Sequence, residues 1–432
     1  MSPDAYADSL VRRRTEVLGP AYRHFYEEPL TPVRAEDVWL YDAQDRAYLD
    51  CYNNVPCVGH CHPRVVQALS EQAGRLNTHT RYLHEGVVAY AERLASLFPQ
   101  PLSRVALTCS GSEANDLALR IAQAATGQTG LIVTDFAYHG VTLALADISP
   151  SLRQSNAPHV RLVRAPKPFG RATAADVAAR FVEDIQAAAR DLQARGFGLS
   201  AMMVDTVFAS DGIFPDRNGA LSAAAQAVRE AGGVFIADEV QGGFGRTGDF
   251  WWAFQREAGL VPDIVTMGKP MGAGHPMAGL VMQSRLAESF GREQRYFNTF
   301  GGNTVSAAVG HAVLDVIEQE GLRERAADVG DYLRQGLHRL AHEHPGIGDV
   351  RGLGLYIGVE LVDATRHGTP DPQLAAFLVN ALRRAGVLIS VCGRDANVLK
   401  IRPPLSFRRE HADIFLEAMA DALAGAAARA PA

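Results

Sequence analysis

Short, almost wholly apolar segments recur along the chain and alternate with longer segments in which apolar residues follow a helical spacing. Residues 131–134 and 232–237 are examples of the first kind, which is typical of strands buried on both faces of a parallel sheet. Residues 174–195 and 304–319 are examples of the second kind and predict helices. The pattern therefore predicts the α/β class, with strands and helices alternating along most of the chain.

The two ends of the chain predict smaller structures. Residues 39–50 predict a hairpin with its turn at 42–46. From about residue 321 we expect a smaller α/β unit, with strands at 350–360, 387–390 and 397–405 and a closing helix at 411–427. The predicted division is an N-terminal segment that packs with the small domain (1–55), a large domain (56–320) and a C-terminal small α/β domain (321–432).

Length and composition agree with a soluble globular protein of more than one domain. A chain of 432 residues is too long for one simple core. Hydrophobic residues make up 47% and charged residues 21%, the ordinary proportions of a globular protein. The net charge of −6 comes without a basic block, which argues against nucleic acid as a partner. The sequence shows no signal peptide and no apolar run long enough to span a bilayer, so we expect a cytoplasmic protein that does not bind membranes.

Three cysteines and two histidines lie close together in the sequence and raise the question of a metal site. These residues are Cys51, Cys57, Cys61, His60 and His62. Their spacing fits no common zinc pattern, and a proline comes directly after them. We therefore predict no metal site here and expect reduced thiols in a loop or core.

An acid and a lysine stand at the ends of two predicted strands, and together they indicate a particular chemistry. Asp238 follows an apolar segment and precedes four glycines, and Lys269 follows another apolar segment between Gly268 and Pro270. Ligand crevices of open α/β sheets lie beyond such strand ends. A carboxylate that keeps a pyridine nitrogen protonated, together with a lysine that forms a Schiff base, is what pyridoxal phosphate (PLP) requires. Taken singly, Lys269 would be a solvated lysine in most proteins, and Asp238 could be a surface acid on a tight turn.

A third stretch of residues is suited to binding an anion. Residues Ser110, Gly111 and Ser112 lie between a predicted strand and a predicted helix. A turn of small residues at a helix N-terminus presents free backbone N–H groups and a positive dipole to a phosphate. By itself such a turn is also an ordinary helix cap.

Taken together and in this order, the three stretches resemble the class III aminotransferases, which are PLP enzymes of fold type I. The resemblance implies a large domain built on a mostly parallel seven-stranded sheet and a small domain made of N- and C-terminal segments. It also implies a homodimer with shared active sites. Lys269 would carry the cofactor as a Schiff base and Asp238 would pair with the ring nitrogen. Ser110, Gly111, Ser112, Tyr138, His139, Val240, Gln241 and Thr299 would bind the rest of the cofactor.

Several of these residues have specific implied roles. Tyr138 would stack on the pyridine ring, although a half-buried tyrosine at a strand end is an equally good interpretation without the family. His139 would support the turn or touch the ring edge, and Val240 would pack under the ring. Gln241 would bond the phenolic oxygen. Thr299 would reach the cofactor phosphate of the other subunit, or would simply cap the next helix.

The chain differs from the family at two positions that bind the substrate or act on the substrate-binding arginine. Members commonly have Glu-Pro-Val-Gln-Gly-Glu where this chain has residues 205–210, so that Ser210 replaces a glutamate. They also have an arginine that binds the substrate carboxylate where this chain has Lys400, with Arg402 two places later. On a strand both would point to one face, and the alignment favours Lys400 as the anion contact. The candidate substrate-binding residues are Lys400, Arg402, Arg81, Tyr52 and Asn54; Arg81 could instead pair with Glu85 at the surface.

The prevailing activity of the family favours an aminotransferase that moves an amino group from a small amine or amino acid to a keto acid. The alternative is a phospho-lyase that eliminates phosphate from a phosphorylated amine such as phosphoethanolamine. Stretches such as Gly59–Pro63 resemble a subgroup that includes such lyases. The presence of Lys269 argues against a non-enzymatic relative that has lost the chemistry.

Overall fold

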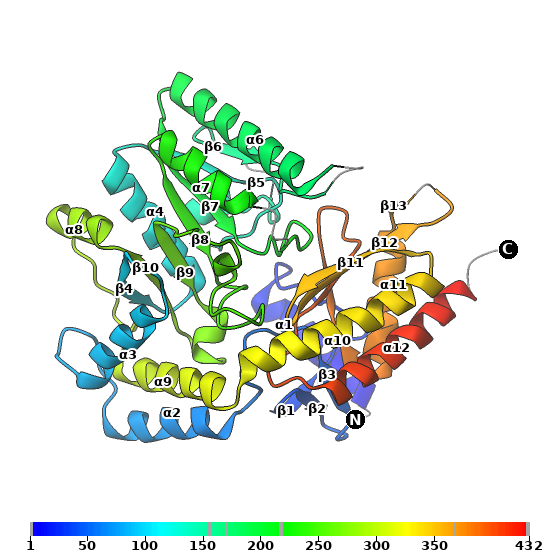
Figure 1. The fold of residues 1–432 in the computed structure, drawn as a ribbon. Coiled ribbons are helices and arrows are strands. Elements are labelled where there is room, and N and C mark those ends of the chain that lie inside the picture. The colour runs from blue at the N-terminus through cyan, green and yellow to red at the C-terminus, as the bar shows by residue number, and fades with distance from the viewer. Residues whose placement is uncertain (1–2, 154–156, 169–171, 216–218, 367, 429–432) are drawn as a thin grey trace.

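The computed structural model describes residues 3–153, 157–168, 172–215, 219–366 and 368–428, and its largest element is a seven-stranded sheet (Figure 1). The strands follow the order β4-β10-β9-β8-β7-β5-β6. Strand β10 is antiparallel to both of its neighbours, and the other pairings are parallel. The mostly parallel seven-stranded sheet is thereby confirmed. Its strands are β4 (Leu102–Thr108), β5 (Gly130–Thr134), β6 (Val160–Val163), β7 (Leu199–Asp205), β8 (Val234–Asp238), β9 (Ile264–Met267) and β10 (Ala278–Gln283).

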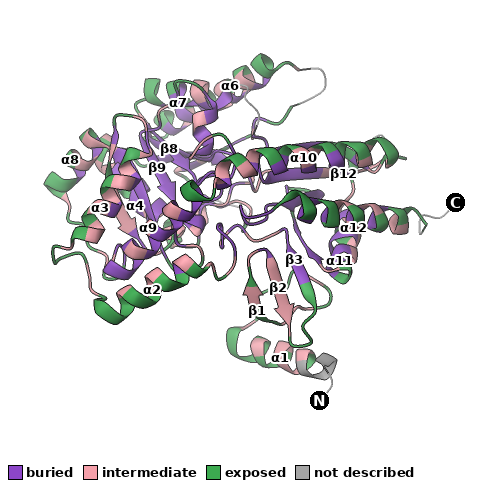
Figure 2. Cartoon of the chain, turned by 60° about the horizontal axis from the view of Figure 1, so that its bottom comes forward, coloured by how far each residue is buried: buried purple, intermediate pink, exposed green. Residues whose placement is uncertain are grey.

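Helices cover both faces of this sheet and enclose its apolar strands. On one face lie α4 (Gly111–Thr126), α5 (Leu143–Asp147) and α8 (Ser284–Glu293). The other face is covered by α2 (Pro63–Arg75), α3 (Glu85–Ser96), α6 (Ala174–Ala194), α7 (Ala220–Glu230) and α9 (Thr304–Gln319). Figure 2 shows strands β8 and β9 buried and the outer sides of α2 and α8 exposed. The inner strands β7, β8 and β9 are buried along their whole length because each side meets a helix layer. The edge strands β4 and β6 are partly exposed.

The chain has two smaller sheets, and the first of them joins the beginning of the chain to its end. The first has the order β1-β2-β3-β14 and contains β1 (Pro32–Glu36), β2 (Trp39–Asp42), β3 (Ala47–Asp50) and β14 (Val387–Leu388). The second contains β11 (Ile347–Leu353), β12 (Tyr356–Asp363), β13 (Thr369–Pro370), β15 (Ser390–Cys392) and β16 (Val398–Ile401). Helices α10 (Leu322–Glu343), α11 (Pro372–Ala385) and α12 (Arg409–Ala427) pack beside them, and α1 (Pro3–Leu18) starts the chain. The domain division at residues 55 and 320 stays a prediction.

The prediction of one strand at 350–360 was wrong. The structure has a hairpin there, because β11 and β12 pair in antiparallel fashion from Leu353 and Tyr356 outward. Gly354 has a φ of +52°, and a Cβ on it would lie 2.6 Å from the carbonyl oxygen of Arg246. Only glycine fits this turn and this close approach, so the glycine marks a chain reversal rather than an interruption within one strand.

Two further strand predictions need correction. Residues 387–390 do not form one strand but are divided between β14 and β15, which belong to different sheets. The strand predicted at 397–405 ends at Ile401, because Pro403 and Pro404 carry no N–H for a ladder. Beyond the strand, the N–H of Arg402 donates to the carbonyl of Cys51 at 2.8 Å, so the chain turns toward the loop after β3.

The described residues also show the surroundings of the cysteine and histidine cluster. Cys51 and Cys57 are buried and Cys61 is exposed. His60 lies 2.7 Å from the carboxylate of Asp50, and His62 lies 3.0 Å from that of Glu320. Among the described helices, none is long and apolar enough to cross a membrane.

Candidate active site

Parallel pairing brings the predicted acid and lysine to one edge of the large sheet. Asp205 at the end of β7 is the direct partner of Asp238 at the end of β8. Lys269 follows β9, the next strand in the sheet. All three residues line one crevice of about 280 Å³, together with the N-terminus of α4. The crevice lies beyond the carboxyl ends of the strands, as expected for this type of sheet.

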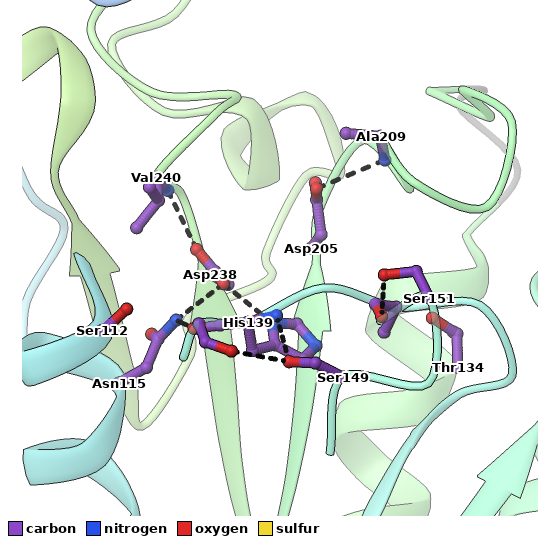
Figure 3. A network of polar contacts seen from close by, with 12 residues as sticks. Ser112, Asn115, Thr134, His139, Ser149, Ser151, Asp205, Ala209, Asp238 and Val240 are labelled. Carbon is purple, nitrogen blue, oxygen red and sulfur yellow. Dashed lines mark hydrogen bonds and ion pairs between the residues drawn. The ribbon is translucent and has the colours of Figure 1, made fainter. Parts of the chain in front are cut away.

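Asp238 is held in a fixed orientation by three hydrogen bonds (Figure 3). Its Oδ2 accepts from Asn115 Nδ2 at 2.9 Å and lies 2.8 Å from His139 Nδ1. Its Oδ1 accepts from the backbone N–H of Val240 at 3.0 Å. No lysine or arginine of the described chain forms an ion pair with it. The carboxylate is therefore oriented and still able to pair with a cationic ring nitrogen.

Lys269 has the environment of a nucleophilic amine. It lies at the start of a 3-10 turn, η2 (Lys269–Gly272), and lines the crevice. Burial lowers the pKa of Lys269, and the nearby charge of Arg402 lowers it further. The chain contains only three lysines, Lys167, Lys269 and Lys400, and Lys269 is the one that lines this crevice. A deprotonated amine here could form the covalent bond that PLP requires.

The N-terminus of α4, where a phosphate site was predicted, lines the crevice. Ser110 caps the helix by accepting from the N–H of Glu113, and Ser112 Oγ accepts from the N–H of Val141. A Cβ on Gly111 would lie 3.1 Å from the methyl groups of Val240, so the backbone approaches that side chain closely. The hydroxyl hydrogen of Ser112 and the first N–H groups of the helix can therefore serve an anion.

The remaining predicted cofactor residues of this chain also line the crevice. They are Tyr138, His139, Val240 and Gln241. Burial raises the pKa of Tyr138, and the charge of Asp238 adds to that effect. Gln241 Oε1 accepts from Arg402 Nη1 at 2.6 Å and from the hydroxyl of Tyr356 at 3.0 Å. Because two donors fix that oxygen, the amide nitrogen of Gln241 is left to donate to a ligand, which suits the phenolic oxygen of PLP.

Arg402 joins Gln241 to the loop that follows β3. Its Nη1 also donates to Asn54 Oδ1 at 3.1 Å, and its guanidinium lies 4.8 Å from the ring centre of Tyr52. Both Arg402 Nε and Asn54 Nδ2 are buried without a hydrogen-bond partner. Arg402 thus contacts two other predicted substrate residues, Tyr52 and Asn54, and bonds the crevice residue Gln241.

Lys400 has a different position. Its Nζ donates to the carbonyl of Ala209 at 3.0 Å. Like Arg402, it is not among the residues that line the crevice, but within the described chain it has no bond to a residue that does. Burial lowers its pKa to about 7, with Arg402 as the next cause. The carboxylate of Asp205 accepts from the N–H groups of Val207 and Ala209. Lys400 and Asp205 therefore hold the loop in which Ser210 replaces the family's glutamate.

Two further predicted residues are exposed and also do not line the crevice. Arg81 is exposed and its guanidinium lies 3.8 Å from the ring centre of Phe297, and the described chain shows no ion pair between Arg81 and Glu85. Thr299 is exposed in the loop before α9 and does not line the crevice. The structure therefore gives neither residue a contact with the candidate cofactor site of the same chain.

Sequence reasoning missed three residues that the structure adds. Asn115 bonds Asp238, Tyr356 bonds Gln241, and His275 lines the crevice while its Nε2 lies 2.9 Å from Ser306 Oγ. Asn115 stands one helical turn after the anion-binding serines, a spacing that could have indicated it. Tyr356 and His275 carry no such local signal.

Comparison with known proteins identifies one family and, within it, relatives named for two different activities. Residues 22–423 match the family described as aminotransferase class-III. A Drosophila melanogaster protein named alanine–glyoxylate aminotransferase 2-like is 40% identical, covering 94% of this chain and 85% of the relative. A Caenorhabditis elegans protein named ethanolamine-phosphate phospho-lyase homolog 1 is 36% identical, covering 94% and 91%. A phospholyase from Arthrobacter, solved in complex with phosphoethanolamine, is 45% identical with a TM-score of 0.93, covering 96% of this chain and 99% of that chain.

Proposed function

The chain belongs to the class III aminotransferase family, and on that premise we propose that it is a phospho-lyase that eliminates phosphate from a small phosphorylated primary amine such as phosphoethanolamine. The family and its phospholyase relatives depend on PLP, and this chain is a PLP-dependent enzyme of fold type I. The residues of the crevice fit that cofactor. Asp238 is oriented for the ring nitrogen, Lys269 for covalent attachment and the N-terminus of α4 for the phosphate.

The observation that carries the proposal is the buried charge of Arg402. Its two hydrogen-bonded side-chain partners, Asn54 and Gln241, are both neutral, and no carboxylate of the described chain pairs with it. Its Nε is buried without a partner. An unpaired buried guanidinium is costly and favours an anionic ligand. Phosphate matches this group well, because a guanidinium can donate two parallel hydrogen bonds to it.

The loop at 205–210 supports elimination rather than exchange between two substrates. An aminotransferase that alternates between different substrates benefits from a carboxylate that neutralises the arginine when a substrate lacks the anion. This chain has Ser210 at that position. Lys400 donates to the carbonyl of Ala209 and brings no negative charge to Arg402. A site with a permanent positive charge suits one substrate that always brings the same anion.

The chain's own residues account for the steps of an elimination. PLP, when bound, supplies the electron sink that acidifies the carbon next to the substrate nitrogen. The amine of Lys269 removes the proton from that carbon. The C–O bond on the neighbouring carbon breaks, and phosphate leaves with the bonding electrons while Arg402 binds it. Water then hydrolyses the released enamine to an aldehyde and ammonia, so no oxidant or keto acid is needed.

Transamination is the second candidate. It is supported by the prevailing activity of the family and by the 40% identity to the Drosophila protein named as an aminotransferase. The two reactions share the proton abstraction by Lys269 and differ in the outcome, which is either transfer of the amino group to a keto acid or loss of phosphate. We assay the purified enzyme with phosphoethanolamine alone and with alanine plus a keto acid. Phosphate release from the first mixture supports the lyase, and amino transfer confined to the second contradicts it.

Arg402→Gln should lower kcat/KM for phosphoethanolamine by about a hundredfold, the effect of removing one partner of a buried charged hydrogen bond (about 3 kcal/mol). Glutamine keeps hydrogen-bonding groups but loses the charge. The matched control is Arg409→Gln, because Arg409 is exposed and pairs with Asp328. Steady-state phosphate release provides the measurement. A change below threefold in Arg402→Gln would remove this residue from the anion site.

We also infer a homodimer in which Thr299 of one subunit contacts the cofactor phosphate of the other. This inference rests on the family resemblance and on the exposure of Thr299 in its own chain. Thr299→Ala should weaken PLP binding about tenfold through one lost hydrogen bond to a charged group, with Thr365→Ala, an exposed residue on a distant turn, as control. Equal PLP affinity in Thr299→Ala, or a fully active monomer by light scattering, would contradict the inference.

A cytoplasmic location stays a prediction from the sequence.

A further inference from the structure

A second cavity of about 390 Å³ lies apart from the catalytic crevice, and the two share no lining residue. It is formed by α6, by the segment that follows β6, and by β11, β12 and β16 of the smaller sheet. Phe136, Phe181 and Phe214 supply apolar wall, and charged side chains of both signs supply the rest. Nothing in the proposed chemistry uses this cavity.

Most charges around the cavity are already paired, and among its partly buried carboxylates Asp211 is the exception. The ion pairs are Arg164–Asp184 at 2.7 Å, Lys167–Glu360 at 2.7 Å, Arg351–Glu360 at 2.6 Å and Arg394–Asp135 at 2.9 Å. Asp211 accepts only from neutral groups, the hydroxyl of Thr134 at 2.9 Å and the N–H of Phe136 at 3.2 Å. Within the described part of the chain no cation pairs with Asp211.

The unpaired carboxylate of Asp211 indicates what the cavity would take. Asp211 is partly accessible where it lines the cavity and is otherwise surrounded by protein. Burial raises its pKa to about 7, and the charges of Asp205 and Asp135 add to this effect. A positive ligand would relieve the cost of ionising it. Within the described residues no group of three metal-ligating side chains gathers here or elsewhere, so a metal ion fits poorly.

We propose that this cavity binds the ammonium group of a small organic amine, with Asp211 as the opposing charge and the phenylalanine rings around its carbon atoms. The cavity volume suits a ligand of a few heavy atoms, and the phenylalanine rings provide an apolar surface for its carbon atoms. The proposed site stands independently of the reaction that the catalytic crevice performs.

The site is connected to the catalytic crevice by one short loop. Asp205, at the start of the loop, lines the catalytic crevice, and Asp211 and Gly212 line the second cavity. Lys400 bonds the carbonyl of Ala209, and Arg351 Nη2 bonds the carbonyl of Gly212 at 2.7 Å. An amine at Asp211 therefore contacts the same loop that borders the substrate, and we expect it to change the KM of the enzyme.

Choline is the probe that separates the two sites, because its quaternary nitrogen cannot attach covalently to a cofactor in the catalytic crevice. Calorimetric titration of the holoenzyme with choline should show one site per chain. Asp211→Asn should weaken that binding at least about tenfold, Asp211→Glu should largely retain it, and Asp421→Asn, an exposed acid on α12, should leave it unchanged.

Thermal unfolding will show whether Asp211→Asn folds. If it does not, a second variant keeps the test valid. Phe214→Leu retains an apolar side chain but removes a ring of the wall, and it should weaken choline binding several-fold. Choline should also shift the KM of the wild type for its amine substrate. Absence of saturable choline binding to the wild type overturns the proposal. Unchanged affinity in a folded Asp211→Asn, or in Phe214→Leu, overturns it as well.

Discussion

Lys269→Ala abolishes turnover and covalent attachment of the cofactor. The expected loss of activity is about 10⁴-fold or more, because one residue supplies both the covalent bond to PLP and the amine that moves the substrate proton. Its position supports both roles, since it lines the crevice, and burial and Arg402 lower its pKa. Borohydride reduction and then mass spectrometry measure the attachment directly.

The control for this experiment comes from the small number of lysines. Lys167 is half exposed and pairs with Glu360, away from the crevice. Lys167→Ala should keep the cofactor, its visible absorbance and the activity. Because only three lysines are present, the labelled peptide identifies its residue without ambiguity. A reduced cofactor adduct found on Lys167 or Lys400 in the wild type would contradict the assignment of Lys269.

Asp238→Asn should lower kcat by about a hundredfold or more, corresponding to about 3 kcal/mol for one preorganised electrostatic group. The amide has no negative charge for the ring nitrogen. Its NH₂ group must also face either the N–H of Val240 or the donors on Asn115 and His139, so one hydrogen bond is replaced by a repulsive contact. The fold should survive, since aspartate and asparagine have nearly the same volume.

A matched substitution separates catalysis from general surface effects. Asp331→Asn changes the same groups at an exposed site on α10, where Asp331 pairs with Arg334. It should leave kcat within twofold of the wild type. The measurements are kcat and the spectrum of the bound cofactor at saturating PLP. If Asp238→Asn retained more than a tenth of the wild-type kcat, the role of Asp238 at the ring nitrogen would be untenable.

The central part of the site could be predicted because its signals are local in the sequence. Asp238 and Lys269 each come directly after a short apolar strand, and glycines surround them both. Parallel pairing then brings such strand ends together without further information. The anion site at Gly111 is local in the same sense, because a strand, a small-residue turn and a helix succeed one another.

The contacts of the candidate substrate-binding residues could not be predicted in the same way. Two residues apart on a strand, Lys400 and Arg402 were expected to share a face, but the strand ends at Ile401. The backbone of Arg402 bonds Cys51 instead, roughly 350 positions earlier in the chain, and its side chain reaches Gln241. Such partners are set by tertiary structure. Similarly, the hairpin at β11 and β12 depends on Gly354 meeting the backbone of Arg246, a contact that no local pattern reveals.

The central claim is that the enzyme eliminates phosphate, and turnover without a keto acid tests it most directly. The holoenzyme is incubated with a large excess of phosphoethanolamine as the only substrate, and phosphorus NMR monitors inorganic phosphate while ammonia is assayed in parallel. The account predicts continued turnover, with phosphate and ammonia formed in equal amounts and in large molar excess over enzyme. Reaction that stops after one amino group per chain without phosphate release, and resumes only when a keto acid is added, would contradict it.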